Sequence, residues 1–134
     1  MHFTYTRQVF AFECDIYGHL NNANYLHLYE EARAVALVRA GFSIAKLKQI
    51  GLSIYVVDAS ISYLAPVYIE DICTIKSQVS QMNRVKSIWE QSVFVGEKHC
   101  SKIVLKAAFA KNGKPCRVDK PIFEKLKRSF KNGD

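Results

Sequence analysis

Residues 15–25 have the sequence DIYGHLNNANY, and the change of pattern at this stretch decides the fold. The stretch holds an acid, a glycine, a histidine and three asparagines, in a chain that is 49% hydrophobic. Before it, residues 4–14 are rich in aromatic residues and contain valine, which is typical of a strand. After it, apolar residues recur at helical spacing over 23–40. The stretch is therefore predicted to be a turn between a strand and a long helix.

The predicted long helix has clear start and stop signals. Asn21 or Asn22 is a plausible N-cap, and Gly41 is a typical stop signal. Apolar residues, including Leu26 and Val38, surround most of the helix. This distribution is typical of a helix enclosed by other structure rather than one lying on a surface.

After residue 51 the apolar period changes to two, which predicts strands. The four predicted strands are separated by turn-like segments and lie near 55–63, 69–79, 85–95 and 103–109. A short helix is also predicted over 43–50. The order predicts an α+β fold in which one largely antiparallel sheet covers one apolar helix.

A short basic helix is predicted near the C-terminus, over about 119–131. Its amphipathic pattern could contact a membrane, but three turns are short for that role, so docking on its own domain is favoured. The chain of 134 residues is expected to form a single domain, 1–134.

Composition excludes several classes of function. No apolar run reaches the roughly 18 residues of a membrane span, and the N-terminus lacks the pattern of a secretory signal. A cytoplasmic protein without stable membrane insertion is expected. The four cysteines form no C-x-x-C pair, so no metal site is expected. The net charge is +7, but no nucleic-acid reader motif is present, so nucleic acid is not an expected partner.

The polar stretch allows two interpretations. In the first, Asp15 satisfies turn or helix amides and the asparagines cap the helix. In the second, Asp15 is a nucleophile or general base, and the N–H groups at the helix start stabilise the oxyanion of a carbonyl substrate. His19 could act as a base or orient the loop. Chemistry alone leaves both interpretations open.

Three segments of the sequence, the first of which includes this turn, form a recognisable set of motifs. A D-x-x-G-H-L-N-N-x-x-Y motif starts at Asp15 and is followed by YEEAR at 29–33. ISYLAPV at 61–67 precedes the acids of Glu70-Asp71-Ile72, and a weaker match, NRVKS, occupies 83–87. Together these segments resemble hotdog-fold acyl-CoA thioesterases of the 4-hydroxybenzoyl-CoA thioesterase-like branch. The resemblance covers about residues 4–111.

The resemblance implies a hotdog fold, in which a five-stranded antiparallel sheet wraps a long central helix. It also implies a homodimer or homotetramer with active sites at the dimer interface. The implied reaction is hydrolysis of acyl-CoA or acyl-carrier-protein thioesters, with no cofactor other than the CoA of the substrate. Asp15 matches the catalytic carboxylate, and the Asn22 N–H is expected to bind the oxyanion. His19 and Tyr25 are expected to shape the site.

Arg84 and Lys86 are the candidates for binding the phosphates of CoA, because they lie near a predicted turn. Ala65 is a departure, since many relatives carry a basic residue just before the turn proline. Two alternatives stay open: a non-catalytic binder of acyl-CoA or acyl-carrier protein, and a hotdog dehydratase. The dehydratase is less favoured because its D-x-N-P-x-H type loop has a proline that is missing after Asp15. The acyl group itself cannot be predicted.

Overall fold

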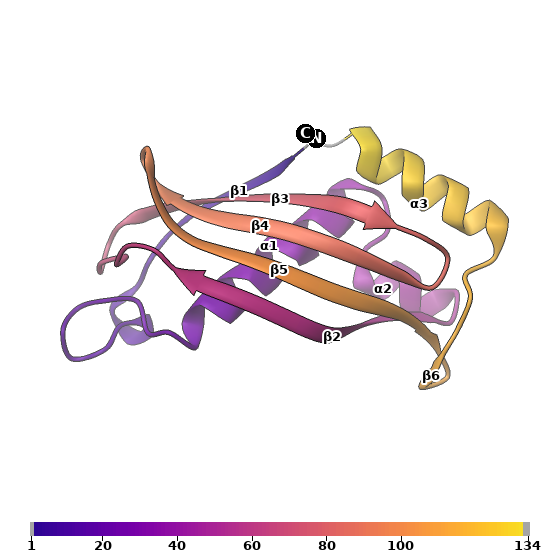
Figure 1. Cartoon of the computed structure of the whole chain (residues 1–134), viewed down its shortest axis with the longest axis horizontal. Helices are drawn as coiled ribbons and strands as arrows, with labels where there is room; N and C mark the ends of the chain where they lie inside the picture. The colour runs from indigo at the N-terminus through magenta and orange to yellow at the C-terminus, as the bar shows by residue number, and fades with distance from the viewer. Residues whose placement is uncertain (1, 133–134) are drawn as a thin grey trace.

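The computed structural model describes residues 2–132, in which a long helix lies against one face of an antiparallel sheet (Figure 1). In chain order the elements are β1 (Phe3–Gln8), the 3-10 turn η1 (Ala11–Glu13), α1 (Asn24–Arg39), α2 (Ile44–Gln49), β2 (Leu52–Tyr63), β3 (Ile72–Met82), β4 (Lys86–Val95), β5 (Lys98–Lys111), β6 (Lys114–Pro115) and α3 (Lys120–Asn132). This arrangement confirms the predicted α+β hotdog fold.

The sheet has the strand order β1-β3-β4-β5-β2, with the two-residue β6 paired to β5. All of these pairs are antiparallel. β1 and β2 therefore lie at opposite edges, although only helices separate them in the sequence. A helix of 16 residues rises about 24 Å, and the two edges of a five-stranded sheet are about 19 Å apart, so α1 is long enough to carry the chain across.

The core lies between α1 and the concave face of the sheet. Leu28, Tyr29 and Ala36 of α1 are at most 2% exposed, as are the sheet residues below them, which include Ile75, Val93 and Ile103. Leu26 and Val38, by contrast, are 45% and 62% exposed. The sheet therefore covers one side of α1, as expected of a wrapped helix, and the side that carries Leu26 and Val38 stays open in a single chain.

A buried polar network fixes α1 to the sheet. The Tyr29 hydroxyl donates to Ser101 Oγ at 2.7 Å. Gln91 Nε2 donates to the Tyr29 carbonyl at 3.0 Å and to Ser77 Oγ at 2.9 Å. Arg33 Nη1 in turn donates to Gln91 Oε1 at 2.9 Å. Satisfied polar groups of this kind fix one orientation of the helix on the sheet.

α3 docks on the same chain, as its amphipathic pattern predicts. Leu126 and Phe130 are buried. The Phe130 ring packs edge-on against Phe3 and Trp89, with centroids 5.6 Å and 5.3 Å apart. None of the helices within residues 2–132 is both long enough and apolar enough to cross a bilayer.

The first strand is shorter than predicted, because β1 ends at Gln8 and a 3-10 turn replaces its second half. Glu13 explains the change: its Oε1 accepts a hydrogen bond from the Phe10 N–H at 3.0 Å and so stabilises the turn. A side chain that satisfies a nearby backbone amide competes with continued strand pairing.

Candidate active site

The loop that carries the polar stretch is closed by its own hydrogen bonds. The Asp15 N–H donates to the His19 carbonyl at 2.8 Å, and the Gly18 N–H donates to the Asp15 carbonyl at 3.0 Å. Asp15 Oδ1 accepts from the N–H groups of Tyr17 at 2.9 Å and His19 at 3.2 Å. Gly18 has φ of +76°, a left-handed conformation that glycine adopts without steric cost. Asp15 therefore does hold the turn, as the first interpretation predicts, but with one carboxylate oxygen.

The same loop is fastened to the segment that follows β2. The Leu20 N–H donates to the Val67 carbonyl at 2.7 Å, and the Ile69 N–H donates to the Gly18 carbonyl at 3.0 Å. The His19 ring packs edge-on against Tyr68, with centroids 4.9 Å apart. These contacts hold the loop beside the end of β2.

The start of α1 differs from the N-cap prediction. The N-cap is Ala23, which has helical φ and ψ and no side-chain cap. Asn21 instead lies two residues before Ala23, where its Oδ1 accepts from the Ala23 N–H at 2.9 Å and its carbonyl accepts from the Asn24 N–H at 2.9 Å. The prediction that Asn21 or Asn22 caps the helix is therefore wrong, because this extra turn pushes the first helical residue to Asn24.

Asn22 contributes its backbone at this position. Its carbonyl accepts a hydrogen bond from the Tyr63 hydroxyl at 2.9 Å. Its N–H donates to no acceptor within residues 2–132. A backbone N–H without a protein acceptor at the entry to a helix is available to a ligand oxygen.

A cavity of about 290 Å³ lies where this loop meets the end of β2. Four predicted site residues line it together: Asp15, His19, Asn22 and Tyr25. The other lining residues are Leu20, Tyr63, Leu64, Ala65 and Pro66. The fold thus gathers these four predicted residues into one pocket at the start of α1.

Tyr25 forms the buried floor of this pocket. It is 3% exposed, and its ring packs edge-on against Tyr63, with centroids 5.1 Å apart. Burial raises the pKa of Tyr25 to about 12, although a hydrogen bond from the Val67 backbone lowers it in part. Tyr25 therefore remains a neutral phenol near neutral pH, which suits a role in shape rather than in proton abstraction.

An ion-pair network that the sequence does not reveal supports the loop from behind. Arg7 Nη1 donates to Glu13 Oε1 at 2.8 Å, and Arg7 Nε donates to Glu31 Oε1 at 2.7 Å. The Glu13 carbonyl accepts from the Asn21 N–H at 3.0 Å and from Asn24 Nδ2 at 2.8 Å. Fixing Glu13 therefore fixes the entry to α1.

This network also settles the protonation of Glu13. The hydrogen bond from Arg7 lowers the pKa of the Glu13 carboxyl, and the same hydrogen bond raises the pKa of Arg7. Glu13 is 7% exposed, so its charge is compensated inside the protein. No residue spacing in the sequence predicts this pair, because η1 bends Glu13 back towards β1.

The two candidates for CoA binding lie far from Asp15 within one chain. Arg84 and Lys86 flank the β3–β4 turn, where Arg84 Nε donates to the Val118 carbonyl at 2.7 Å. The Asp15 loop lies instead near the start of β3, and β3 has 11 residues, which corresponds to about 33 Å. A single chain therefore does not bring these residues to the pocket, and their role stays a prediction.

Lys98, at the start of β5, is a basic residue near the pocket that the sequence reasoning missed. Its Nζ donates to the Pro66 carbonyl at 3.2 Å and lies 5.5 Å from the centroid of the Tyr68 ring. Pro66 lines the cavity directly beside Ala65. Lys98 thus brings a positive charge close to Ala65, where the family resemblance led us to expect a basic residue.

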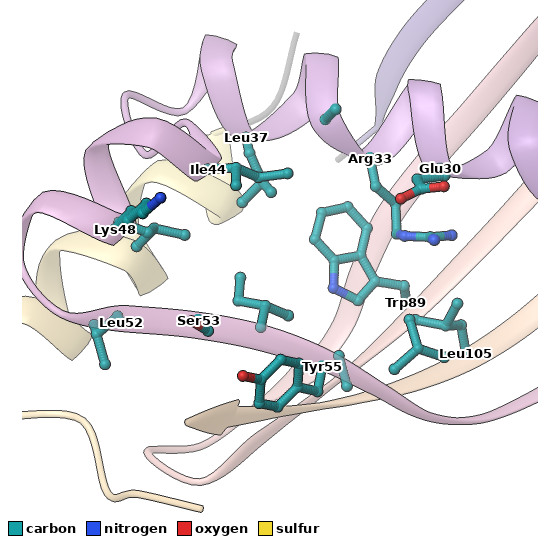
Figure 2. Close-up of a pocket in the computed structure, with 15 residues that line it drawn as sticks. Glu30, Arg33, Leu37, Ile44, Lys48, Leu52, Ser53, Tyr55, Trp89 and Leu105 are labelled. Atoms are coloured by element: carbon teal, nitrogen blue, oxygen red, sulfur yellow. The ribbon is translucent and has the colours of Figure 1, made fainter. Parts of the chain in front are cut away.

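A second cavity, of about 370 Å³, lies between α1, α2 and the sheet (Figure 2). Its lining is mainly apolar and includes Leu37, Leu47, Trp89 and Leu105. The sequence did not single out these residues, because apolar positions that line a cavity have the same pattern as core positions.

A long helix that crosses a five-stranded antiparallel sheet is the architecture of the hotdog fold, and the loop carboxylate at the helix start matches the sequence resemblance to thioesterases of that fold. Comparison with known families agrees, because the model of the thioesterase-like superfamily matches residues 9–126. The chain belongs to the thioesterase-like superfamily. The more specific 4-hydroxybenzoyl-CoA thioesterase-like branch stays a prediction.

Comparison with individual proteins agrees with this family assignment. The chain is 29% identical to a putative esterase of Aquifex aeolicus (strain VF5) over 127 residues, which are 95% of this chain and 99% of the relative. It is 34% identical to the long-chain acyl-CoA thioesterase FadM of Escherichia coli (strain K12) over 86 residues, 64% of each chain. The crystal structure of a probable thioesterase from Bartonella henselae superposes with a TM-score of 0.84 and 25% identity, covering 89% of this chain and 100% of that one.

Proposed function

We propose that the chain hydrolyses acyl-CoA thioesters to the free acid and CoA, in the pocket that contains Asp15. One observation carries the proposal: Asp15 and Asn22, whose backbone N–H lacks a protein acceptor within residues 2–132, line the same cavity. A carboxylate and an available amide donor are the two groups that acyl transfer to water requires. The similarity to the E. coli acyl-CoA thioesterase supports CoA as the thiol.

The proposed chemistry assigns one role to each group. The thioester carbonyl oxygen accepts a hydrogen bond from the Asn22 N–H, which stabilises the negative charge that develops there. Asp15 either attacks the carbonyl carbon, forming an anhydride that water then hydrolyses, or removes a proton from the attacking water. In both routes the C–S bond breaks, the CoA thiolate leaves and takes up a proton, and water supplies the second oxygen of the acid.

The loop supports this assignment through the orientation of Asp15. Its Oδ1 is held by two backbone N–H groups, whereas Oδ2 accepts no hydrogen bond from any residue of the described chain. One oxygen thus fixes the side chain and the other stays available for reaction. A catalytic group that its own loop orients needs no further ordering when the substrate binds.

We further propose a homodimer in which the two β2 strands pair, and a homotetramer built from two such dimers stays a prediction. β2 is an edge strand of 12 residues. Tyr55, Val56 and Val57 near its middle are 48%, 53% and 58% exposed. A long apolar edge is unfavourable to leave in water, and antiparallel pairing about a two-fold axis covers it in both copies at once.

This pairing gives Arg84 and Lys86 a role in the second copy. Antiparallel pairing along the full strand sets the start of one β2 beside the end of the other. The start of β2 is also the basic end of the sheet, where Leu52 pairs with Lys111, and Lys86 lies two strands away. The basic end of one chain then faces the Asp15 pocket of the other, which favours binding of CoA phosphates across the interface.

The proposal is tested by measuring free thiol released from butanoyl-, octanoyl-, palmitoyl- and benzoyl-CoA. The expected result is turnover of at least one of these thioesters by the wild type and its loss in Asp15→Ala. Wild-type protein that binds acyl-CoA but releases no thiol would favour the non-catalytic binder. Hydration of an enoyl-CoA without thiol release would favour the dehydratase.

A further inference from the structure

The last residue of β2, Tyr63, is joined to the start of α1 by its side chain. Its hydroxyl donates to the Asn22 carbonyl at 2.9 Å, and its ring packs edge-on against Tyr25, with centroids 5.1 Å apart. The end of β2 and the start of α1 lie side by side in Figure 1. Tyr63 also lines the cavity that holds Asp15. One side chain therefore links the sheet to the backbone segment that carries the proposed oxyanion donor.

The two peptide groups that flank Asn22 carry four polar groups, and three of these have a partner. The Asn21 carbonyl accepts from the Asn24 N–H at 2.9 Å, and the Ala23 N–H donates to Asn21 Oδ1 at 2.9 Å. The Asn22 carbonyl accepts from the Tyr63 hydroxyl. The fourth group, the Asn22 N–H, has no acceptor among residues 2–132. Because each peptide group is planar, fixing the other three groups fixes the direction in which this N–H points.

Tyr63 supplies the one of these three contacts that comes from outside the turn. The other two lie within the turn itself, whereas Tyr63 belongs to the sheet. It pairs with Ser101 of β5, and the N–H groups of the next two residues both donate to the Cys100 carbonyl, at 2.9 Å and 3.1 Å. The sheet thus sets the position of Tyr63, and the hydrogen bond to Asn22 transmits that position to the turn.

We propose that Tyr63 is a positioning residue for the hydrolysis: its hydroxyl holds the peptide group after Asn22 so that the Asn22 N–H meets the thioester oxygen as negative charge develops there. The inference rests on the proposed function. In this role Tyr63 acts through the Asn22 backbone and not on the reacting atoms. An oxyanion donor is effective when its direction is set before the reaction, and a small misplacement of a group in a reactive geometry lowers the rate strongly.

Proton transfer is the other role that a tyrosine in such a pocket could have. The Tyr63 hydroxyl donates to the Asn22 carbonyl, which has no proton to pass on. Because a phenol has one O–H, this proton is not available at the same time to a leaving thiolate. Tyr63 is 46% exposed in one chain, and the proposed pairing of β2 strands places a second strand beside it, which limits the water that competes for the bond. The geometry therefore favours positioning over proton transfer.

Tyr63→Phe keeps the ring and removes the hydroxyl alone. On the acyl-CoA that the wild type hydrolyses fastest, kcat is expected to fall about tenfold while KM changes by less than about twofold, because the oxyanion develops only in the transition state. Tyr55→Phe is the matched control and should keep wild-type kcat. Tyr55 lies on the same strand with a similar exposed fraction, and its hydroxyl bonds to no residue of the described chain. Unchanged kcat in Tyr63→Phe, a rise in KM alone, or an equal fall of kcat in the control would overturn the proposal.

A variant with p-aminophenylalanine in place of Tyr63 separates positioning from proton transfer. Its amino group restores a hydrogen-bond donor at the same place on the ring, but it is not an acid at neutral pH. Most of the kcat that Tyr63→Phe loses is therefore expected to return. A kcat that stays at the level of folded Tyr63→Phe would overturn the positioning role. Failure of the proposed function has a different signature, since the wild type would then release no thiol from any acyl-CoA.

Discussion

The two carboxylate oxygens of Asp15 have different surroundings. Its Oδ1 closes the loop by accepting from the N–H groups of Tyr17 and His19, and its Oδ2 accepts no hydrogen bond from the described residues, which leaves it available for the proposed reaction. In the proposed mechanism Asn22, which lines the same cavity, contributes its backbone N–H rather than its side chain. Asp15 thus both holds the loop and carries the proposed chemistry, whereas Arg7 and Glu13 only support the loop from behind.

Replacing Arg7 tests the supporting network. Arg7→Met leaves the buried Glu13 carboxylate unpaired, so the free energy of unfolding at neutral pH is expected to fall by about 2–4 kcal/mol. Arg117→Met is the control, because Arg117 is exposed, and a change below about 0.5 kcal/mol is expected there. Urea unfolding measures both variants.

The pH dependence of the same variant has a definite sign. The pKa of Glu13 is lowered in the folded state, so its stabilising effect is present above the unfolded pKa of about 4.3 and is lost as pH falls through the folded value. Wild type should therefore lose more stability than Arg7→Met on acidification. Equal acid sensitivity of the two proteins would show that the pair does not hold Glu13 ionised.

At the scale of elements, α3 closes the end of the core that the sheet leaves open. Phe130 contacts both Phe3 of β1 and Trp89 of β4, and so joins α3 to one edge and to the middle strand of the sheet. Its basic residues face outward while its apolar residues are covered. The helix therefore has a structural function that does not depend on contact with a membrane.

Truncation of the Phe130 side chain measures this function. Phe130→Ala is expected to lower the free energy of unfolding by about 3–5 kcal/mol, because a buried aromatic ring is lost and a cavity remains. Lys127→Ala, on the exposed side of α3, should cost less than about 0.5 kcal/mol. Thermal or urea unfolding that does not distinguish the two variants would contradict the docking of α3.

The elements themselves were predictable where the apolar period was clear. The long helix was expected over 23–40 and runs over Asn24–Arg39, and the later strands appear in the expected order. The end of β1 was not predictable, since it depends on the contact of Glu13 with Phe10 and Arg7. The pairing of β1 with β3 was not predictable either, because it depends on the path of the long helix across the sheet and not on a local sequence pattern.

At the scale of the whole molecule, the candidate site was predictable only in part. The motif after Asp15 placed four residues that the fold gathers into one pocket. The turn segment at 83–87 supplied Arg84 and Lys86 as further candidates, but these lie at the other end of the sheet. The cavity between α1, α2 and the sheet had no sequence signal, because its lining comes from two helices and three strands that extend from Glu30 to Ala107. A single sequence does not show how two copies of the chain pair.

Disruption of the β2 edge tests whether two copies pair through this strand. Val57→Lys is expected to give monomers and to abolish most turnover, because charged side chains at an edge strand oppose pairing. Val104→Lys, on the outer face of β5, is the control and should stay dimeric. Sedimentation velocity together with thiol release measures both properties. A wild-type protein that is monomeric while turning over would contradict the shared site.

The central claim is that the Asp15 carboxylate carries the hydrolysis. Its most direct test is kcat for thiol release from palmitoyl-CoA by Asp15→Asn beside Asp119→Asn, the latter an exposed aspartate just before α3. The account predicts that kcat falls at least about a hundredfold in Asp15→Asn and changes by less than about twofold in Asp119→Asn. Wild-type kcat in folded Asp15→Asn would contradict it.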